Sequence, residues 1–98
     1  MFARVHTLQS TPEQQDEGLK IIRDRLLPWA RESTGFRGVI GLRDRARGTA
    51  LLITLWADEE SLEASESAGD QLSALTAATV GATRRSLDDY EVALFEVD

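Results

Sequence analysis

The chain has 98 residues, of which 42% are hydrophobic and 29% charged, and its formal net charge is −6. This length fits a single domain, over 1–98, with one hydrophobic core. The absence of cysteine excludes disulfides and thiolate chemistry and favours a reducing cytoplasm. The negative charge argues against nucleic acid as the main partner, and no run approaches the ~20 apolar residues of a membrane span, so no membrane partner is expected.

The chain opens with a predicted strand over 2–8 and a strong helix start at Thr11. Thr11 suits the N-cap, Pro12 suits the first helical position, and Gln14 stands where a capping box requires it. Pro28 lacks a backbone donor, so it predicts a kink or the end of the regular helix. Apolar residues follow the helix start at helical spacing: Leu19, Ile22, Leu26 and Trp29.

Two apolar runs, 36–42 and 50–56, predict a β-hairpin around the short loop 44–48. Gly48 supplies the positive φ that such loops require, and Gly35 marks the end of the preceding helix. The second run is apolar at both odd and even positions. We therefore expect this strand to be covered on both faces.

A second predicted helix begins at Asp58, a favourable N-cap residue. Gly69-Asp70 predicts a break in it, and Gly81 ends the helical region. A polar connector over 84–88 then leads to a fourth predicted strand over 90–97. The inward stripe of this helix is predicted to be Leu62, Ser65, Ala68, Leu72 and Leu75.

The element order βαββαβ predicts an α+β, ferredoxin-like fold: a four-stranded antiparallel sheet with both helices on one face. The open face is expected to be apolar, which a monomer would expose to water. A second copy related by a two-fold axis would cover it, giving a homodimer through the open sheet face. The residues expected on that face are Phe2, His6, Leu8, Leu52 and Trp56, with part of Val92 and Leu94.

Three short motifs carry a family resemblance: Gly35-Phe36, Leu55-Trp56, and the acidic run 58–64 that follows. With these motifs and its element order, the chain resembles the dimeric α+β barrel proteins of the antibiotic biosynthesis monooxygenase (ABM) type. That family includes cofactor-independent oxygenases of polyketide-like quinols, haem-degrading enzymes, and many small proteins without a known activity. The resemblance implies a fold more firmly than a reaction.

His6 is the only histidine, and the resemblance places it at a position that faces the pocket in relatives. Two interpretations stay open. His6 is a general base that takes a phenolic proton and opens an electron-rich substrate to dioxygen, or it is a structural histidine hydrogen-bonded within the dimer interface. Arg4 shares its strand face and is a candidate substrate-binding residue. A buried arginine would need a partner, and the sequence does not name one.

Trp56 matches a tryptophan that lines the cleft in many relatives, where it would stack on a planar substrate. The alternative is a large core residue that closes one end of the sheet. Thr54 shares the face of Trp56, so its hydroxyl is either a cleft group or a satisfied interior one. Tyr90 is either a polar donor at the cleft rim or a residue packed at the strand edge.

Relatives often carry a histidine in the second helix where this chain has Ser65, so haem degradation is disfavoured unless His6 binds the iron from a different direction. We expect no cofactor and no metal site. A cluster of arginines on the hairpin is interpreted as solvated charge that protects the hairpin from edge-to-edge aggregation. The alternative is that it attracts an anionic ligand or guides the acidic helix of a partner chain. The cluster consists of Arg37, Arg43, Arg45 and Arg47.

The sequence thus predicts a small-molecule-binding protein that acts as a cofactor-independent monooxygenase on an aromatic or quinol-type substrate. The competing prediction is a non-catalytic dimeric module that binds or senses a ligand. A polar-lined cavity of ~300 Å³ or more between sheet and helices, with His6 in it, would favour the enzyme.

Overall fold

The computed structural model describes residues 1–66 and 81–98, and the fold follows the predicted order of elements closely. The helical residues 59–66 lie between the third and fourth strands. The other elements are β1 (Phe2–Gln9), α1 (Pro12–Ile21), the π-helical turn η1 (Ile22–Leu26), α2 (Leu27–Glu32), β2 (Phe36–Asp44), β3 (Thr49–Trp56) and β4 (Thr83–Glu91).

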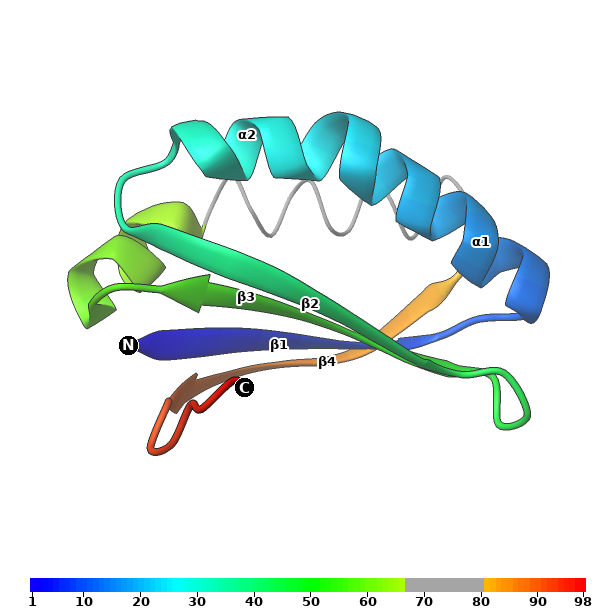
Figure 1. Cartoon of the computed structure of the whole chain (residues 1–98). Helices are drawn as coiled ribbons and strands as arrows, with labels where there is room; N and C mark the ends of the chain where they lie inside the picture. Colours follow the sequence, from blue (N-terminus) through cyan, green and yellow to red (C-terminus); the bar gives the residue numbers. More distant parts are fainter. Residues whose placement is uncertain (67–80) are drawn as a thin grey trace.

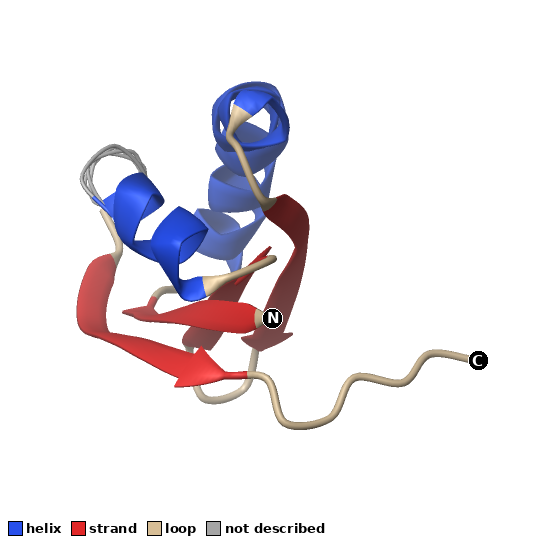
Figure 2. Ribbon diagram, turned by 90° about the vertical axis from the view of Figure 1, so that its left-hand side faces the viewer, coloured by secondary structure: helices blue, strands red, loops and turns tan. Residues whose placement is uncertain are grey.

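The four strands form one antiparallel sheet in the order β2-β3-β1-β4. The helical segments lie on one side of this sheet, as Figures 1 and 2 show. The predicted α+β, ferredoxin-like fold is therefore confirmed. In the part of the chain that the structure describes, no helix is long and apolar enough to cross a membrane.

The start of α1 is fixed by the predicted capping box. The Thr11 hydroxyl accepts a hydrogen bond from the Gln14 backbone N–H at 3.2 Å, and the Thr11 N–H donates to Gln14 Oε1 at 2.8 Å. Further along, the α-helix widens into η1, where the Leu27 N–H donates to the Ile22 carbonyl five residues earlier. Pro28 follows at once and has no N–H to donate back to this turn, so the predicted irregularity takes the form of a π-helical turn.

Gly48 adopts the positive φ predicted for it, +69°, and Gly35, which follows the helix whose end it was predicted to mark, has a φ of +80°. At Gly35 the requirement is also steric, because a Cβ there would lie 2.1 Å from the Ser61 hydroxyl oxygen. Asp58 caps the helical residues 59–66 as predicted, since its Oδ1 accepts a hydrogen bond from the Ser61 N–H at 2.7 Å. These contacts hold the end of the helical layer against the start of β2.

The prediction for the two sheet faces was wrong. Arg4 donates a hydrogen bond to Ser65 in the second helical segment, so its face of β1 points toward the helices. His6 and Leu8 share that face by strand alternation, and Leu52 is paired with His6. The residues expected on the open face, Phe2, His6, Leu8, Leu52 and Trp56, therefore face the helical layer. The grouping was right and the direction was reversed, because both faces of β3 are apolar and alternation alone cannot choose between them.

The face away from the helices carries Leu51, Ile53 and Leu55 of β3 instead. The register pairs Ile53 with Ile40 and Leu51 with Leu42. Ile40 is 37% exposed and Leu42 is 50% exposed. This surface, with its apolar side chains from β2 and β3, is called the open sheet face below.

The fourth strand is Thr83–Glu91, so both the predicted connector over 84–88 and the predicted strand over 90–97 were wrong. β4 pairs with β1 along its whole length, and its side chains are mostly exposed. An edge strand needs backbone pairing rather than apolar side chains, which is why the polar stretch forms it. Residues 92–98 have no regular secondary structure, and Figure 2 shows them leaving the sheet. Leu62 and Ser65 are buried as predicted, while Ala68, Leu72, Leu75 and the break at Gly69-Asp70 lie outside the described residues.

Candidate functional site

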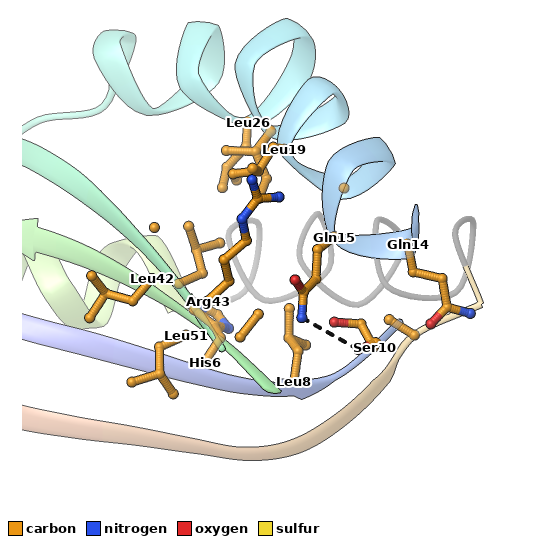
Figure 3. Close-up of a pocket in the computed structure, with 16 residues that line it drawn as sticks. His6, Leu8, Ser10, Gln14, Gln15, Leu19, Leu26, Leu42, Arg43 and Leu51 are labelled. Atoms are coloured by element: carbon orange, nitrogen blue, oxygen red, sulfur yellow. Dashed lines mark hydrogen bonds between the residues drawn. The ribbon is translucent and has the colours of Figure 1, made fainter. Parts of the chain in front are cut away.

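A cavity of about 110 Å³ lies between α1, η1 and the sheet, near the end of β1 where the chain enters α1 (Figure 3). Its walls are mostly apolar. Leu19, Ile22 and Leu26 come from the helical layer, and Leu8 and Leu52 come from the sheet. The polar residues that line it are His6, Ser10, Gln14, Gln15 and Arg43.

His6 lies on the wall that the sheet provides and is 2% exposed. Its position follows from strand alternation, since β1 points Arg4, His6 and Leu8 toward the helices. Of the five residues predicted from the sequence to form a site, His6 alone is among those lining this cavity. An imidazole in such a place can accept or donate a proton to a bound molecule.

Gln15 lies on the helical wall, opposite the end of β1. Its Nε2 donates hydrogen bonds to the backbone carbonyls of Ser10, at 3.4 Å, and Thr49, at 3.3 Å. These two bonds tie the first turn of α1 to the ends of β1 and β3. Gln15 Oε1 and the Ser10 hydroxyl are both buried, and neither has a hydrogen-bond partner in the structure.

Arg43 lies beside the cavity on β2, and its guanidinium binds the carboxylate of Asp16 on α1. Arg45 reaches the same carboxylate at 3.2 Å. The hydrogen bond from Arg43 holds the pKa of Asp16 below its ordinary value, with the positive charges of both arginines adding to the effect. Two members of the predicted arginine cluster thus join the hairpin to α1 across the side of the cavity.

Arg4 has the partner that the sequence did not name. Its side chain is 3% exposed, and its Nε donates to Asp89 Oδ1 on β4 at 3.0 Å. Its Nη1 donates to the Ser65 hydroxyl at 3.2 Å, and that hydroxyl donates in turn to the Leu62 carbonyl at 2.7 Å. The guanidinium is therefore engaged by β4 and by the helical residues 59–66.

Trp56 is 1% exposed and belongs to an aromatic cluster rather than to the cavity lining. It meets Trp29 edge-on at 6.4 Å between ring centroids and Phe36 at 5.6 Å. Its indole N–H donates to the Thr54 hydroxyl at 3.0 Å, so the two predicted polar groups satisfy each other. Trp56 is four residues along β3 from Leu52, the partner of His6, so roughly 13 Å of strand separates Trp56 from the position opposite His6.

Tyr90 lies on β4 opposite Ala3 and next to the partner of Arg4, so its side chain points to the other face of the sheet from Arg4. It is 57% exposed and shares neither the cavity nor the helix-facing side of the sheet. The structure thus brings Arg4, His6, Thr54 and Trp56 onto one sheet face, places only His6 at the cavity, and leaves Tyr90 apart.

Sequence reasoning missed Ser10 and Gln15. A signal for Gln15 was present, because it lies four residues before Leu19 and so continues the inward stripe of α1 with a polar residue. A polar side chain on an inward stripe needs a buried partner or a ligand. Ser10 carried no comparable signal, since it falls at the end of a strand.

The residues that the structure describes contain no group of three or more side chains able to hold a metal ion. Haem does not fit at Ser65, since this side chain is 5% exposed, occupied by Arg4 and Leu62, and offers a hydroxyl rather than an imidazole or thiolate.

Comparison with known protein families finds no family profile that matches the sequence. An uncharacterised protein of Mycobacterium tuberculosis, Rv2558, is 28% identical over the whole chain, and the chain spans 41% of that relative's length.

Solved structures share the fold. A Deinococcus radiodurans protein named for the antibiotic biosynthesis monooxygenases superimposes with a TM-score of 0.73 at 14% identity, covering 100% of this chain and 98% of its own. SnoaB, a cofactor-independent oxygenase from Streptomyces nogalater, gives a TM-score of 0.66 at 13% identity, covering 96% of this chain and 94% of its own. The chain therefore has the α+β fold of the ABM-type proteins, as the sequence resemblance implied.

Proposed function

We propose that this chain binds a small hydroxylated molecule in the cavity beside His6 and acts on it as a cofactor-independent monooxygenase of the ABM type. The observation that carries the proposal is the burial of the only histidine of the chain on a wall of this cavity. The fold it shares with SnoaB makes this chemistry a reasonable one to test.

The reaction needs few protein groups. Neutral His6 takes the proton of an aromatic hydroxyl, and the electron-rich phenolate left behind reduces dioxygen. One oxygen atom ends in the organic product and the other in water, with the substrate supplying the electrons. Apolar walls favour this course, because they keep bulk water away from the oxidised intermediate.

The competing proposal is a non-catalytic module that binds or senses a ligand. It is favoured because other predicted site residues use their polar groups within the protein. Arg4 binds Asp89, and Trp56 binds Thr54, so these polar groups already have partners in the protein. The cavity of about 110 Å³ is also below the ~300 Å³ expected of an enzyme pocket.

Oxygen consumption separates the two proposals. The purified protein would be incubated with a panel of one-ring phenols and quinols, and dissolved oxygen followed against a protein-free control, because quinols oxidise spontaneously. Catalysed uptake supports the enzyme. A ligand-dependent rise in Tm without uptake supports the binding module.

A homodimer through the open sheet face is part of the proposal. Ile40 and Leu42 expose apolar surface there, beside Ile53 and Leu51 of β3. Such a surface is stabilised when a second copy covers it. Because Leu52 faces the helices, substituting it would disturb the core rather than the interface.

Ile40→Glu tests the interface directly, since it places a charge on the open sheet face at a position that does not line the cavity. Lys20→Glu, an exposed position on α1, is the matched control. Light scattering behind a sizing column should give a dimer for the parent and the control and a monomer for Ile40→Glu. A monomeric parent at micromolar concentration would contradict the dimer.

Residues 1–98 are proposed to form one functional unit, which corresponds to a part of longer relatives such as Rv2558. The absence of cysteine fits a cytoplasmic location, and this too belongs to the proposal.

A further inference from the structure

Two buried oxygen atoms beside the cavity make no hydrogen bond within the fold. Ser10 is 7% exposed and Gln15 is 5% exposed, and neither Ser10 Oγ nor Gln15 Oε1 has a hydrogen-bond partner. Figure 3 shows both side chains at the same end of the cavity, with the dashed line marking the bond from the Gln15 amide to Ser10. Buried polar groups are nearly always paired, so this pair needs an explanation.

The orientation of the Gln15 amide is set by its neighbours. Both groups near its nitrogen, the carbonyls of Ser10 and Thr49, can only accept hydrogen bonds. The NH₂ must therefore face them, and the carbonyl oxygen Oε1 must face elsewhere. The backbone of Ser10 is likewise in use, because its N–H donates to the Gly48 carbonyl at 2.8 Å and its carbonyl receives Gln15. Only the hydroxyl of Ser10 is left for a ligand.

These two atoms define the polar group that they can bind. Gln15 Oε1 can only accept a hydrogen bond, while the Ser10 hydroxyl can donate one. A hydroxyl group carries both the donor that Gln15 requires and the acceptor that Ser10 requires. A carboxylate cannot donate to Gln15. A cation would be desolvated, because the described residues that line the cavity include no acidic side chain.

The volume of the cavity limits the rest of the ligand. About 110 Å³ is of the same order as the ~150 Å³ apolar cavity that holds one benzene ring. Leu8, Leu19 and Leu52 supply the apolar contacts. The occupant is therefore the size of one ring or a short branched chain, and a fused-ring molecule would be excluded unless the helical layer moved.

We propose that this cavity binds a neutral molecule of one-ring size through a single hydroxyl group, which donates to Gln15 Oε1 and accepts from Ser10 Oγ. The inference rests on the proposed small-molecule binding and names its ligand class and anchoring residues. It applies to the enzyme and to the non-catalytic module alike, since it concerns binding only.

Three probes of similar size test it: phenol, toluene and benzoate, titrated into the protein and followed by backbone amide NMR. We expect phenol and toluene to shift the resonances of residues that line the cavity and benzoate to leave them unchanged. Ser10→Ala should weaken phenol binding roughly two- to tenfold, the range for one neutral hydrogen bond, and leave toluene binding unchanged. Thr34→Ala, an exposed hydroxyl away from the cavity, should leave both unchanged.

Ser10→Ala should fold with the Tm of the parent, because the Ser10 hydroxyl makes no hydrogen bond in the fold. Gln15→Met, of similar shape, should also weaken phenol selectively, although it costs some stability through the two lost bonds to carbonyls. The inference is overturned if phenol does not bind, if benzoate binds tighter than phenol, or if Ser10→Ala weakens phenol and toluene alike or not at all. Phenol binding, with no catalysed oxygen uptake from any phenol or quinol of the panel, would reject the oxygenase and leave this inference intact.

Discussion

The buried guanidinium of Arg4 binds the carboxylate of Asp89, with Nε 3.0 Å from Oδ1 and Nη2 3.4 Å from Oδ2. The two residues face each other across β1 and β4. β4 has few apolar side chains, so this ion pair joins the edge strand to the interior through Ser65. The arginine is 3% exposed and the aspartate 47% exposed, so the carboxylate compensates a charge that water cannot reach.

Asp89→Asn should destabilise the protein by about 1.5–3 kcal/mol, the range for hydrogen bonds to charged groups, because Arg4 loses its counter-charge. Asp88→Asn is the matched control: it is exposed, adjacent, and on the opposite face of the same strand. We expect the control to stay within about 0.5 kcal/mol of the parent in urea unfolding. Equal effects of the two substitutions would mean that the ion pair does not stabilise β4.

Gly35→Ala should destabilise the fold by about 1–3 kcal/mol, because the position has a φ of +80° and a Cβ would meet Ser61 at 2.1 Å. Gly18→Ala provides the contrast. It lies within α1, and a Cβ there would have nothing within 4 Å. Since alanine restricts the unfolded chain and favours helix, this change should stabilise by about 0.4–1 kcal/mol. Urea unfolding of the two variants should therefore move in opposite directions from the parent.

We expect the carboxylate of Asp58 to account for part of the loss of stability in acid. The backbone N–H of Ser61, and then its hydroxyl, lower the pKa of Asp58 below its ordinary value. Since the pKa is lower in the folded state, this carboxylate stabilises the fold above its unfolded pKa, and the contribution is lost as pH falls through its folded pKa. Asp58→Asn still caps the helix but does not titrate there, so its Tm should fall less steeply with acid than that of the parent. Parallel curves of Tm against pH would contradict this role.

Haem should bind weakly and should not be degraded. The residue at the expected ligand position, Ser65, is bound by Arg4, and the cavity beside His6 is far smaller than a haem. A titration followed by absorbance should give no sharp Soret band at stoichiometric haem. A sharp band that disappears on adding reductant and air would contradict the assignment.

The arrangement of the sheet could be predicted from the sequence because the local signals agreed. The capping box of Thr11 and Gln14, and the glycines at the hairpin loop and helix end, are short-range features that act as expected. The direction of the sheet faces could not be predicted. In β3, Leu51, Ile53 and Leu55 are as apolar as the set containing Leu52 and Trp56, so only the tertiary contacts decide which set meets the helices.

The candidate site was predicted less well, for a different reason. His6 and Trp56 do share a sheet face, but a shared face does not make a shared pocket when roughly 13 Å of strand separates them. Arg4 binds Asp89, which lies far away in the sequence. Thr54 accepts a hydrogen bond from Trp56, which was itself a candidate site residue. The place of Gln15 on the inward stripe of α1 indicated a buried polar group, but only the structure identifies its partners, the carbonyls of Ser10 and Thr49.

The most direct test of the proposed function is oxygen uptake by His6→Gln. Glutamine keeps much of the shape of the side chain but has no basic nitrogen, so it separates proton transfer from packing. With a one-ring quinol that the parent oxidises, the variant should lose about 10²-fold or more in rate. If His6→Gln consumes oxygen as fast as the parent while both have the same oligomeric state, His6 is structural and the oxygenase proposal is wrong.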